Sequence, residues 1–245
     1  MKRVRIVGAG RVGGALRLAL AASGWDVVGS LGRADDPTAA ARDVELVLVT
    51  TPDGAIATVA GRIAVEPGTV VAHCSGAQTL DVLAPHPRVG SLHPLLSVSD
   101  AVTGAERLRS GCAFALDGDP LLDGLVADLG GRAFRVPAEA RAMYHAAAVI
   151  ASNHLVALFG QVERIAAQAG VPVDAYVDLA RQTLDNVERL GPAAALTGPV
   201  ARGDWATVCR HLRAIDPSER AAYEALAEQA NRLCGRAETL AEVMA

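Results

Sequence analysis

Residues 3–14 read RVRIVGAGRVGG, an apolar stretch that runs directly into the glycines Gly8, Gly10 and Gly13. The β-branched residues before the glycines predict a strand. Apolar residues at helical spacing after them predict a helix that ends near Gly24. A strand, a tight glycine turn and a helix N-terminus in this order predict the first unit of an α/β domain.

The three glycines form the pattern Gly-x-Gly-x-x-Gly, in which each position has its own task. The first makes the tight turn, the second lets a pyrophosphate approach the backbone, and the third lets helix and strand pack closely. The helix that follows presents free N–H groups and a partial positive charge, which favour phosphate. We therefore expect a dinucleotide to contact Gly8, Gly10, Arg11, Val12 and Gly13. An ordinary glycine-rich turn is the alternative.

The rest of the first half alternates apolar, strand-like runs with alanine-rich helical stretches. The runs cover residues 25–32, 44–53, 69–77, 88–94, 112–119 and 132–137. This alternation predicts a doubly wound parallel sheet. After Pro137 no strand-like run remains, and helical stretches follow at 138–170, 172–191, 205–215 and 217–244. We predict an α/β Rossmann domain over residues 1–137 and an all-α helical domain over residues 138–245.

The composition excludes several classes of function. Of the 245 residues, 51% are hydrophobic and 20% are charged, as in soluble globular proteins. A net charge of -4 gives no basic footprint for nucleic acid, and 3% aromatic residues are too few for base stacking. No apolar run is clean enough to predict a membrane span, so we expect a cytoplasmic protein. The four cysteines fit no zinc pattern, and we expect no metal.

The end of the second predicted strand distinguishes NADP from NAD. Proteins that bind NAD usually carry an acidic residue there, which holds the ribose 2′-hydroxyl. This chain carries Ser30 and Arg33 instead, and Asp35 and Asp36 come later. An arginine offers charge and forked donors to a 2′-phosphate. We expect NADP, held in part by Ser30 and Arg33, with NAD the less favoured cofactor and a merely solvated Arg33 the alternative.

Three polar loops follow predicted strands at their carboxyl ends. They are Thr50-Thr51-Pro52-Asp53, His73-Cys74-Ser75-Gly76 and Ser91-Leu92-His93-Pro94-Leu95. Open α/β sheets bind ligands at this edge. The expected cofactor contacts in these loops are Thr51, Pro52, Ser75 and Gly76. Ser75 and His93 are also candidates for the reaction itself, although each loop has turn formation as its alternative.

Several motifs together resemble one family. They are GAGRVG (8–13), TTPD (50–53), HCSGA (73–77), SLHPL (91–95), YHAAAVIASNHLVAL (144–158) and LTGPVARGD (196–204). The chain resembles, over essentially its whole length, bacterial Rossmann-like proteins with a C-terminal helical domain of unknown function. That family is similar to pyrroline-5-carboxylate reductase, ketopantoate reductase, prephenate dehydrogenase and the 3-hydroxyacid dehydrogenases. The resemblance implies an NAD(P)-dependent dehydrogenase or reductase that forms a homodimer through its helical domain.

Two local likenesses imply site residues. SLHPL is similar to the His-Pro-Met loop of prephenate dehydrogenases, which implies that His93 belongs to the active site. HAAAVIASNHL is similar to the ketopantoate reductase helix that carries a catalytic lysine and, eight residues later, an asparagine. Asn153 matches that asparagine, and His145 stands where the lysine would be. Lys2 is the only lysine in this chain, so the sequence departs from ketopantoate reductase at the proton donor.

These observations predict hydride transfer between NADP and a small carbonyl or hydroxy acid that resembles ketopantoate. A developing alkoxide needs a proton donor, for which His145 and His93 are the candidates. Asn153 and Ser75 are the candidates to orient the substrate oxygen. As alternatives, His145 is a satisfied core histidine, Asn153 caps or bridges helices, and His93 fixes a turn.

Two further residues are candidates for substrate binding. Residues seven or eight apart return to about the same side of a helix, which brings Ser152 to the face of His145 and Asn153. Arg202 lies in a predicted loop between helices, where its guanidinium is a candidate clamp for a substrate carboxylate. An ion pair between Arg202 and Asp204 is the alternative.

Two other functions remain open from the sequence. The first is a non-catalytic NADP-binding sensor or partner protein, which would bind the cofactor without turning over any 2-oxo or 3-oxo acid. The second is an enzyme that transfers hydride between a deazaflavin and NADP, which requires an apolar slot for a second flat cofactor.

Overall fold

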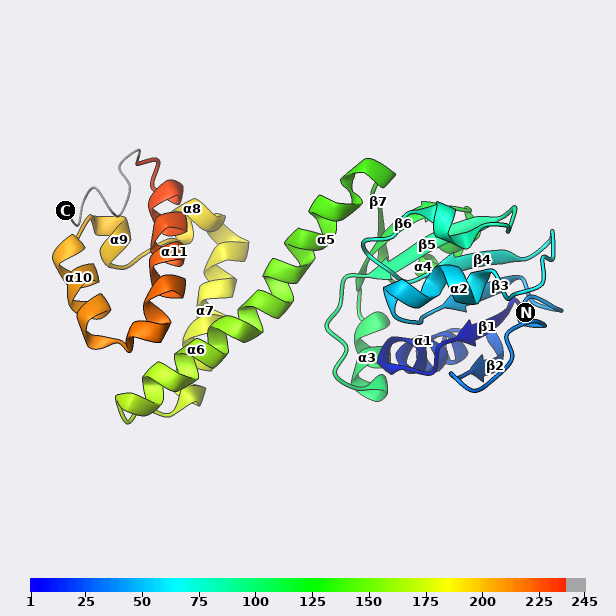
Figure 1. The fold of residues 1–245 in the computed structure, drawn as a ribbon, viewed down its shortest axis with the longest axis horizontal. Helices are drawn as coiled ribbons and strands as arrows, with labels where there is room; N and C mark the ends of the chain where they lie inside the picture. Colours follow the sequence, from blue (N-terminus) through cyan, green and yellow to red (C-terminus); the bar gives the residue numbers. More distant parts are fainter. Residues whose placement is uncertain (237–245) are drawn as a thin grey trace. The chain divides into compact units, whose positions relative to one another are not determined.

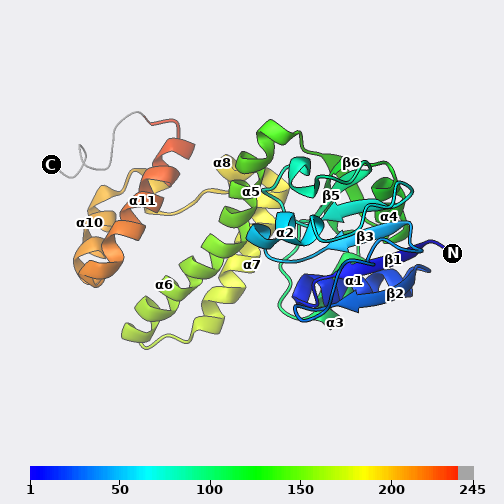
Figure 2. The ribbon, with the colours of Figure 1, turned by 45° about the vertical axis from the view of Figure 1, so that its right-hand side comes forward.

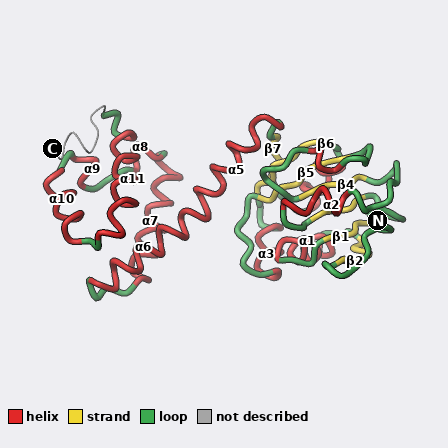
Figure 3. Tube along the Cα trace, viewed as in Figure 1, coloured by secondary structure: helices red, strands yellow, loops and turns green. Residues whose placement is uncertain are grey.

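The computed structural model describes residues 1–236. The chain divides into two compact units, Met1–Ser152 and a second unit from Asn153 onward. Within the described residues every strand lies in the first unit, as Figure 3 shows. The expected order, an α/β domain followed by a helical one, is thereby confirmed. The units divide later than residue 137, because the helix that follows the last strand contacts the sheet domain.

The first unit is built on a seven-stranded sheet (Figure 1). Its strands are β1 (Arg3–Val7), β2 (Asp26–Leu31), β3 (Leu46–Val49), β4 (Val70–His73), β5 (Val89–Pro94), β6 (Ala113–Gly118) and β7 (Arg132–Arg135). Their order across the sheet is β2-β1-β3-β4-β5-β6-β7. All neighbouring pairs are parallel except β5 and β6. This antiparallel pair is the one departure from the predicted parallel sheet.

Helices cover both faces of this sheet. They are α1 (Arg11–Ala22), α2 (Ile56–Ala60), α3 (Ala101–Leu108) and α4 (Leu121–Asp128), whereas α5 (Arg141–Val149) follows the last strand and joins neither core. Side chains of β3 alternate between two cores, because successive residues of a strand point to opposite faces. Leu46 and Leu48 join the core beneath α1, α3 and α4, whereas Val47 and Val49 join the core beneath α2. Burial on both faces explains why the strand is apolar throughout.

The long helix predicted over residues 138–170 contains an irregular turn. After α5 the chain passes through η4 (Ile150–His154), a π-helical segment, and continues as α6 (Leu155–Gln168). Gly170, with φ +69, follows the end of the helix, as the sequence predicts. The π-helical segment has no counterpart in the sequence prediction. Such segments are rare and frequently occur at functional sites.

The second unit consists of helices. After α6 come α7 (Val173–Leu190), α8 (Pro192–Ala195), α9 (Pro199–Arg202), α10 (Trp205–Ala214) and α11 (Pro217–Leu233). Helices α6 and α7 lie antiparallel and side by side (Figure 2). A small core of Val200, Val208, Leu212 and Ala227 joins α9, α10 and α11. The predicted last helix reaches residue 244, and its part beyond 236 lies outside the described residues.

One segment meets the length and composition of a membrane span. It is the 31-residue helical stretch Ala138–Gln168, none of whose most apolar window is buried within the structure. The prediction that no run is long and apolar enough to cross a bilayer is therefore wrong on length and composition. At the start of this stretch, Arg141 and Tyr144 hydrogen-bond to Ser75 and His93 of the sheet domain.

Candidate active site

Two groups of polar residues lie at one edge of the sheet. Strands β1, β3, β4 and β5 are parallel, so their carboxyl ends meet at this edge. The first group surrounds the glycine turn after β1. The second group follows β4 and β5 and includes side chains of α5. Ligands of open α/β sheets bind at such an edge.

The first group lines a cavity of about 620 Å³. Of the predicted cofactor contacts, it brings together Gly8, Gly10, Arg33, Thr51 and Pro52, and it adds Asp35 and Arg62. Three other predicted contacts are not among the residues that line it: Arg11 and Val12 open α1, and Gly13 packs beneath the turn. Ser30 instead lines a separate hollow beside Trp25 and Asp26.

The glycine turn is held by very close backbone contacts. Gly8 has φ +124, a conformation that residues with side chains rarely adopt. A Cβ atom on Gly13 would lie 1.9 Å from the Gly8 carbonyl oxygen, so α1 packs directly against the turn. The Thr50 hydroxyl donates to the same carbonyl oxygen over 2.7 Å. These contacts confine the turn to one shape before any ligand arrives.

The same turn leaves room for a phosphate. A Cβ atom on Gly10 would have nothing within 4 Å, so the backbone here faces open space. Thr51 lines the cavity, and its hydroxyl is buried and has no hydrogen-bond partner in the described part of the chain. A buried hydroxyl without a partner is costly unless a ligand satisfies it. The cavity therefore fits the phosphates of a dinucleotide beside the first turn of α1.

The second group centres on two histidines. His93 Nδ1 lies 2.6 Å from the Tyr144 hydroxyl oxygen, within a hydrogen bond. The rings of His93 and His145 meet edge to face, with centroids 6.0 Å apart. Both rings converge on Gly76, where a Cβ atom would lie 2.8 Å from His145 Cδ2 and 2.9 Å from His93 Cε1. Glycine at position 76 is therefore a steric requirement of the histidine pair.

His73 has a structural role, because its ring is fully buried at the end of β4. Its Nδ1 accepts from the Ser75 backbone N–H over 3.2 Å, and its Nε2 lies 3.3 Å from the Thr79 carbonyl oxygen. Nε2 therefore carries the proton, since a carbonyl oxygen only accepts. Burial lowers the pKa of His73 to about 4, so the ring is neutral at pH 7.

The Ser75 hydroxyl is occupied by the turn in which it lies. It donates to Asp53 Oδ2 over 2.7 Å and accepts from the backbone N–H groups of Ala77 and Gln78, each over 3.1 Å. A hydroxyl has one proton to donate and two lone pairs. All three are used here, so Ser75 shapes the loop, and the loop positions Gly76.

Arg141 places a buried positive charge beneath this group. Its side chain is 1% exposed, its Nη1 donates to the Ser75 carbonyl over 3.4 Å, and its Nη2 lies 3.9 Å from Asp117 Oδ2. Burial lowers the pKa of His93 to about 4, and the neighbouring charges of His145 and Arg141 act in the same direction. Burial also raises the pKa of Tyr144 to about 12. His93 and Tyr144 are therefore both neutral at pH 7.

Other predicted site residues are placed as follows. Ser152 donates its hydroxyl to the Ala148 carbonyl oxygen over 2.7 Å, within its own helix. Asn153 and Arg202 belong to the second unit, so their approach to the sheet edge stays a prediction. Cys74 is not a nucleophile at neutral pH, because burial raises its pKa to about 12.

Sequence reasoning missed three residues of this edge. Arg141 and Tyr144 are three apart on one helix and therefore share a face with His145, a spacing that was visible in the sequence. Arg62 had no such signal, because it follows a short helix far along the chain from Arg33. Within the described residues, no group of three or more His, Cys, Asp or Glu side chains is arranged to hold a metal ion.

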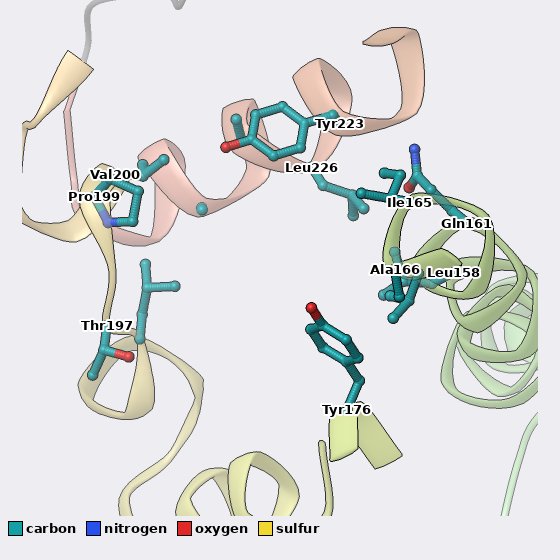
Figure 4. Close-up of a pocket in the computed structure, with 14 residues that line it drawn as sticks. Leu158, Gln161, Ile165, Ala166, Tyr176, Thr197, Pro199, Val200, Tyr223 and Leu226 are labelled. Atoms are coloured by element: carbon teal, nitrogen blue, oxygen red, sulfur yellow. The ribbon is translucent and has the colours of Figure 1, made fainter. Parts of the chain in front are cut away.

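The second unit contains a different kind of hollow. Figure 4 shows Tyr176 reaching into a cavity of about 390 Å³ between α6, α11 and the segment of Thr197 and Pro199. None of the described residues that line it is charged, and few of them carry a polar group. One such group, the Tyr223 hydroxyl, lies 2.7 Å from His211 Nδ1. This apolar cavity has no acid–base group positioned for chemistry.

Two family models match parts of the chain. Residues 33–97 match the model of a Rossmann-like domain, and residues 112–230 match the model of a domain of unknown function, DUF2520. The expected resemblance, a Rossmann-like protein with a C-terminal helical domain of unknown function, is confirmed by these two matches. A search of curated proteins found no match.

Solved structures share the fold over almost the whole chain. A Bacteroides fragilis protein assigned as an NADP oxidoreductase is 21% identical, with a TM-score of 0.77 and coverage of 94% of this chain and 98% of that one. A Thermotoga maritima protein is 24% identical, with a TM-score of 0.71 and coverage of 95% and 98%. Plasmodium falciparum pyrroline carboxylate reductase with NADP bound is 10% identical, with a TM-score of 0.62 and coverage of 95% and 98%. At these identities the likeness establishes the fold.

The close contacts of the glycine turn predict opposite results at two glycines. Gly13→Ala should lower the free energy of unfolding by about 1–3 kcal/mol or more, because its Cβ atom would overlap the Gly8 carbonyl oxygen. Gly10→Ala should change it by less than about 0.5 kcal/mol, because its Cβ atom meets open space. Denaturant titration of both variants measures the difference. Equal losses would contradict the geometry.

Burial of His73 predicts a loss of stability in mild acid. The unfolded chain protonates this histidine near pH 6.5 and the folded chain only near pH 4, so the unfolded state binds more protons between these values. The free energy of unfolding should therefore fall from pH 7 to pH 5, by about 2 kcal/mol for His73. Denaturant titrations at pH 7, 6 and 5 measure this slope. His73→Gln should reduce the slope but not abolish it, because burial also lowers the pKa of His93 to about 4. An unchanged slope would reject the assignment.

Proposed function

We propose that this chain, a Rossmann-like domain followed by the domain DUF2520, is an NADP-dependent oxidoreductase. The observation that supports this proposal most is that one sheet edge holds both the cavity over the glycine turn and the cluster of His93, Tyr144 and His145. The names of the similar Bacteroides and Plasmodium proteins, an NADP oxidoreductase and an NADP-bound reductase, support the same reading. We place the enzyme in the cytoplasm.

Different residues of the cavity would bind different parts of NADP. The open backbone at Gly10 and the first turn of α1 would receive the pyrophosphate, and the Thr51 hydroxyl would gain the hydrogen bond that it lacks. Arg33 would bind the 2′-phosphate at the end of β2. When bound, the nicotinamide supplies or accepts the hydride.

His145 is the group that we propose to exchange a proton with the substrate oxygen. It is half-buried, and its ring nitrogens hydrogen-bond to no other described residue, so they are available to a ligand. His93 is positioned differently, since Tyr144 occupies its Nδ1 and leaves Nε2 on the side of Gly76 and His145. His93 would therefore orient the substrate oxygen, and Tyr144 would orient His93.

The substrate that we propose is a small carbonyl compound or the matching hydroxy acid. Reduction adds a hydride to the carbonyl carbon and a proton to its oxygen, and His145 supplies the proton. The predicted contributions of Ser152, Asn153 and Arg202, including a carboxylate clamp at Arg202, remain part of this proposal. A 2-oxo acid such as ketopantoate and a cyclic imine are the substrates to test first.

Substitution of His145 tests the proposed chemistry. His145→Gln should lower kcat about 10²- to 10⁴-fold, because the proton donor is lost. Tyr144→Phe should lower it less, because only the orientation of His93 is lost. The matched control is His154→Gln, which changes a nearby exposed histidine with no proposed role. Oxidation of NADPH against 2-oxo acids and cyclic imines, with NADPH binding followed by fluorescence, measures both effects.

Three outcomes of that experiment lead to different conclusions. Full turnover by His145→Gln would remove His145 from the mechanism. NADPH binding without turnover of any substrate by the unmodified protein would favour the sensor. Absence of NADPH binding would reject the proposed function.

We also propose that the enzyme is a homodimer through its helical unit. Helices α6 and α7 leave large apolar side chains in solvent, with Val156 72%, Leu179 57% and Leu184 54% exposed. A hollow of about 410 Å³ lies along the same two helices and has an almost wholly apolar lining. Protruding apolar side chains and an apolar hollow on one pair of helices are what a self-complementary, two-fold interface requires.

A charge in this hollow should dissociate the dimer. Leu179→Glu would bury a carboxylate without a partner at the interface. Gln182→Glu places the same charge on the same helix outside the hollow lining and is the matched control. Sedimentation velocity should give a dimer for the unmodified chain and the control, and a monomer for Leu179→Glu. A monomeric unmodified chain would reject the dimer.

A further inference from the structure

The loop after α2 brings a second arginine to the cavity of the glycine turn. Arg33 and Arg62 both line this cavity, although 29 positions separate them in the chain. We propose that Arg62 and Arg33 together form the binding site for the cofactor's 2′-phosphate, so that Arg62 determines the preference for NADP over NAD. This inference rests on the proposed function, because it assigns a further residue to the same nucleotide site.

The backbone of Arg62 is held firmly, whereas its side chain is largely exposed. Its backbone N–H donates to the Val59 carbonyl oxygen over 3.1 Å, and the next residue, Ile63, is buried in the core beneath α2. The side chain itself is 56% exposed. A fixed backbone with an exposed guanidinium is suited to a phosphate, which a planar fork of N–H groups can grip at two oxygens.

Asp36 forms a weak ion pair with the Arg62 guanidinium. Arg62 Nη2 lies 3.4 Å from Asp36 Oδ1, and both side chains are largely exposed. Asp36 Oδ1 already accepts from the backbone N–H and the hydroxyl of Thr38, which hold the carboxylate in place. Exposed ion pairs of this kind are weak, so a phosphate can take over the guanidinium.

The acidic residue nearest to the end of β2 is engaged elsewhere. Asp35 also lines the cavity, but its Oδ2 accepts from the Gly32 backbone N–H over 2.7 Å. An acidic residue that selects NAD accepts from the ribose hydroxyls, whereas one carboxylate oxygen of Asp35 is already bonded within its own turn. With Asp35 fixed to its own turn, the arginines provide the positive charges of this cavity and favour a phosphate at the 2′ position.

Two nucleotides that differ only in the 2′-phosphate test the inference. Titration calorimetry with 2′,5′-ADP and with 5′-AMP measures the contribution of that phosphate without any catalysis. Arg62→Ala should weaken 2′,5′-ADP binding about 10- to 100-fold and leave 5′-AMP binding unchanged. Arg17→Ala removes another exposed arginine, one that does not line this cavity, and should change neither affinity. Thermal unfolding of each variant establishes that it is folded.

The possible results separate this inference from the proposed function. If Arg62→Ala binds 2′,5′-ADP as tightly as Arg17→Ala does, the role of Arg62 is rejected while that of Arg33 stands. Equal losses for both nucleotides would also reject it, because the 2′-phosphate would not be what Arg62 recognises. If the unmodified protein binds neither nucleotide, the proposed function itself fails.

Discussion

Parallel pairing of β1, β3, β4 and β5 is the constraint on which both parts of the site depend. Because these strands point the same way, the glycine turn, the loop at Thr51 and the loop at Gly76 all emerge at one edge. The sheet supplies a rigid base that places the cavity over the glycine turn and the histidine pair at neighbouring strand ends.

Much of this arrangement could be predicted because it is encoded locally. Apolar runs predicted all seven strands, and the spacing of Gly8, Gly10 and Gly13 predicted the turn. The direction of β6 could not be predicted, because an apolar strand looks the same in parallel and antiparallel pairs. The π-helical segment at Ile150 also left no sequence signal, since its residues continue the apolar helical pattern. These features are decided by tertiary packing and not by local preference.

The site residues also divide into those that the local sequence predicts and those that only the fold brings together. Arg33 and Thr51 lie directly at strand ends, where sequence order predicts a ligand contact, and the structure brings both to one cavity. Arg62 reaches that cavity only through the fold, so no spacing in the sequence could predict its position there. Ser75 shows the opposite case. Its position is as predicted, but three hydrogen bonds within its own turn use the whole hydroxyl, which the sequence alone does not reveal.

Gly76 provides a criterion for sorting related sequences of unknown activity. Any side chain there would occupy the space in which His93 and His145 converge. A homologue with both histidines and a larger residue at this position must hold its imidazoles apart. Conversely, loss of both histidines would remove the steric pressure for glycine. The three positions should therefore change together among diverging sequences, and a chain that breaks this pattern has a different chemistry at this sheet edge.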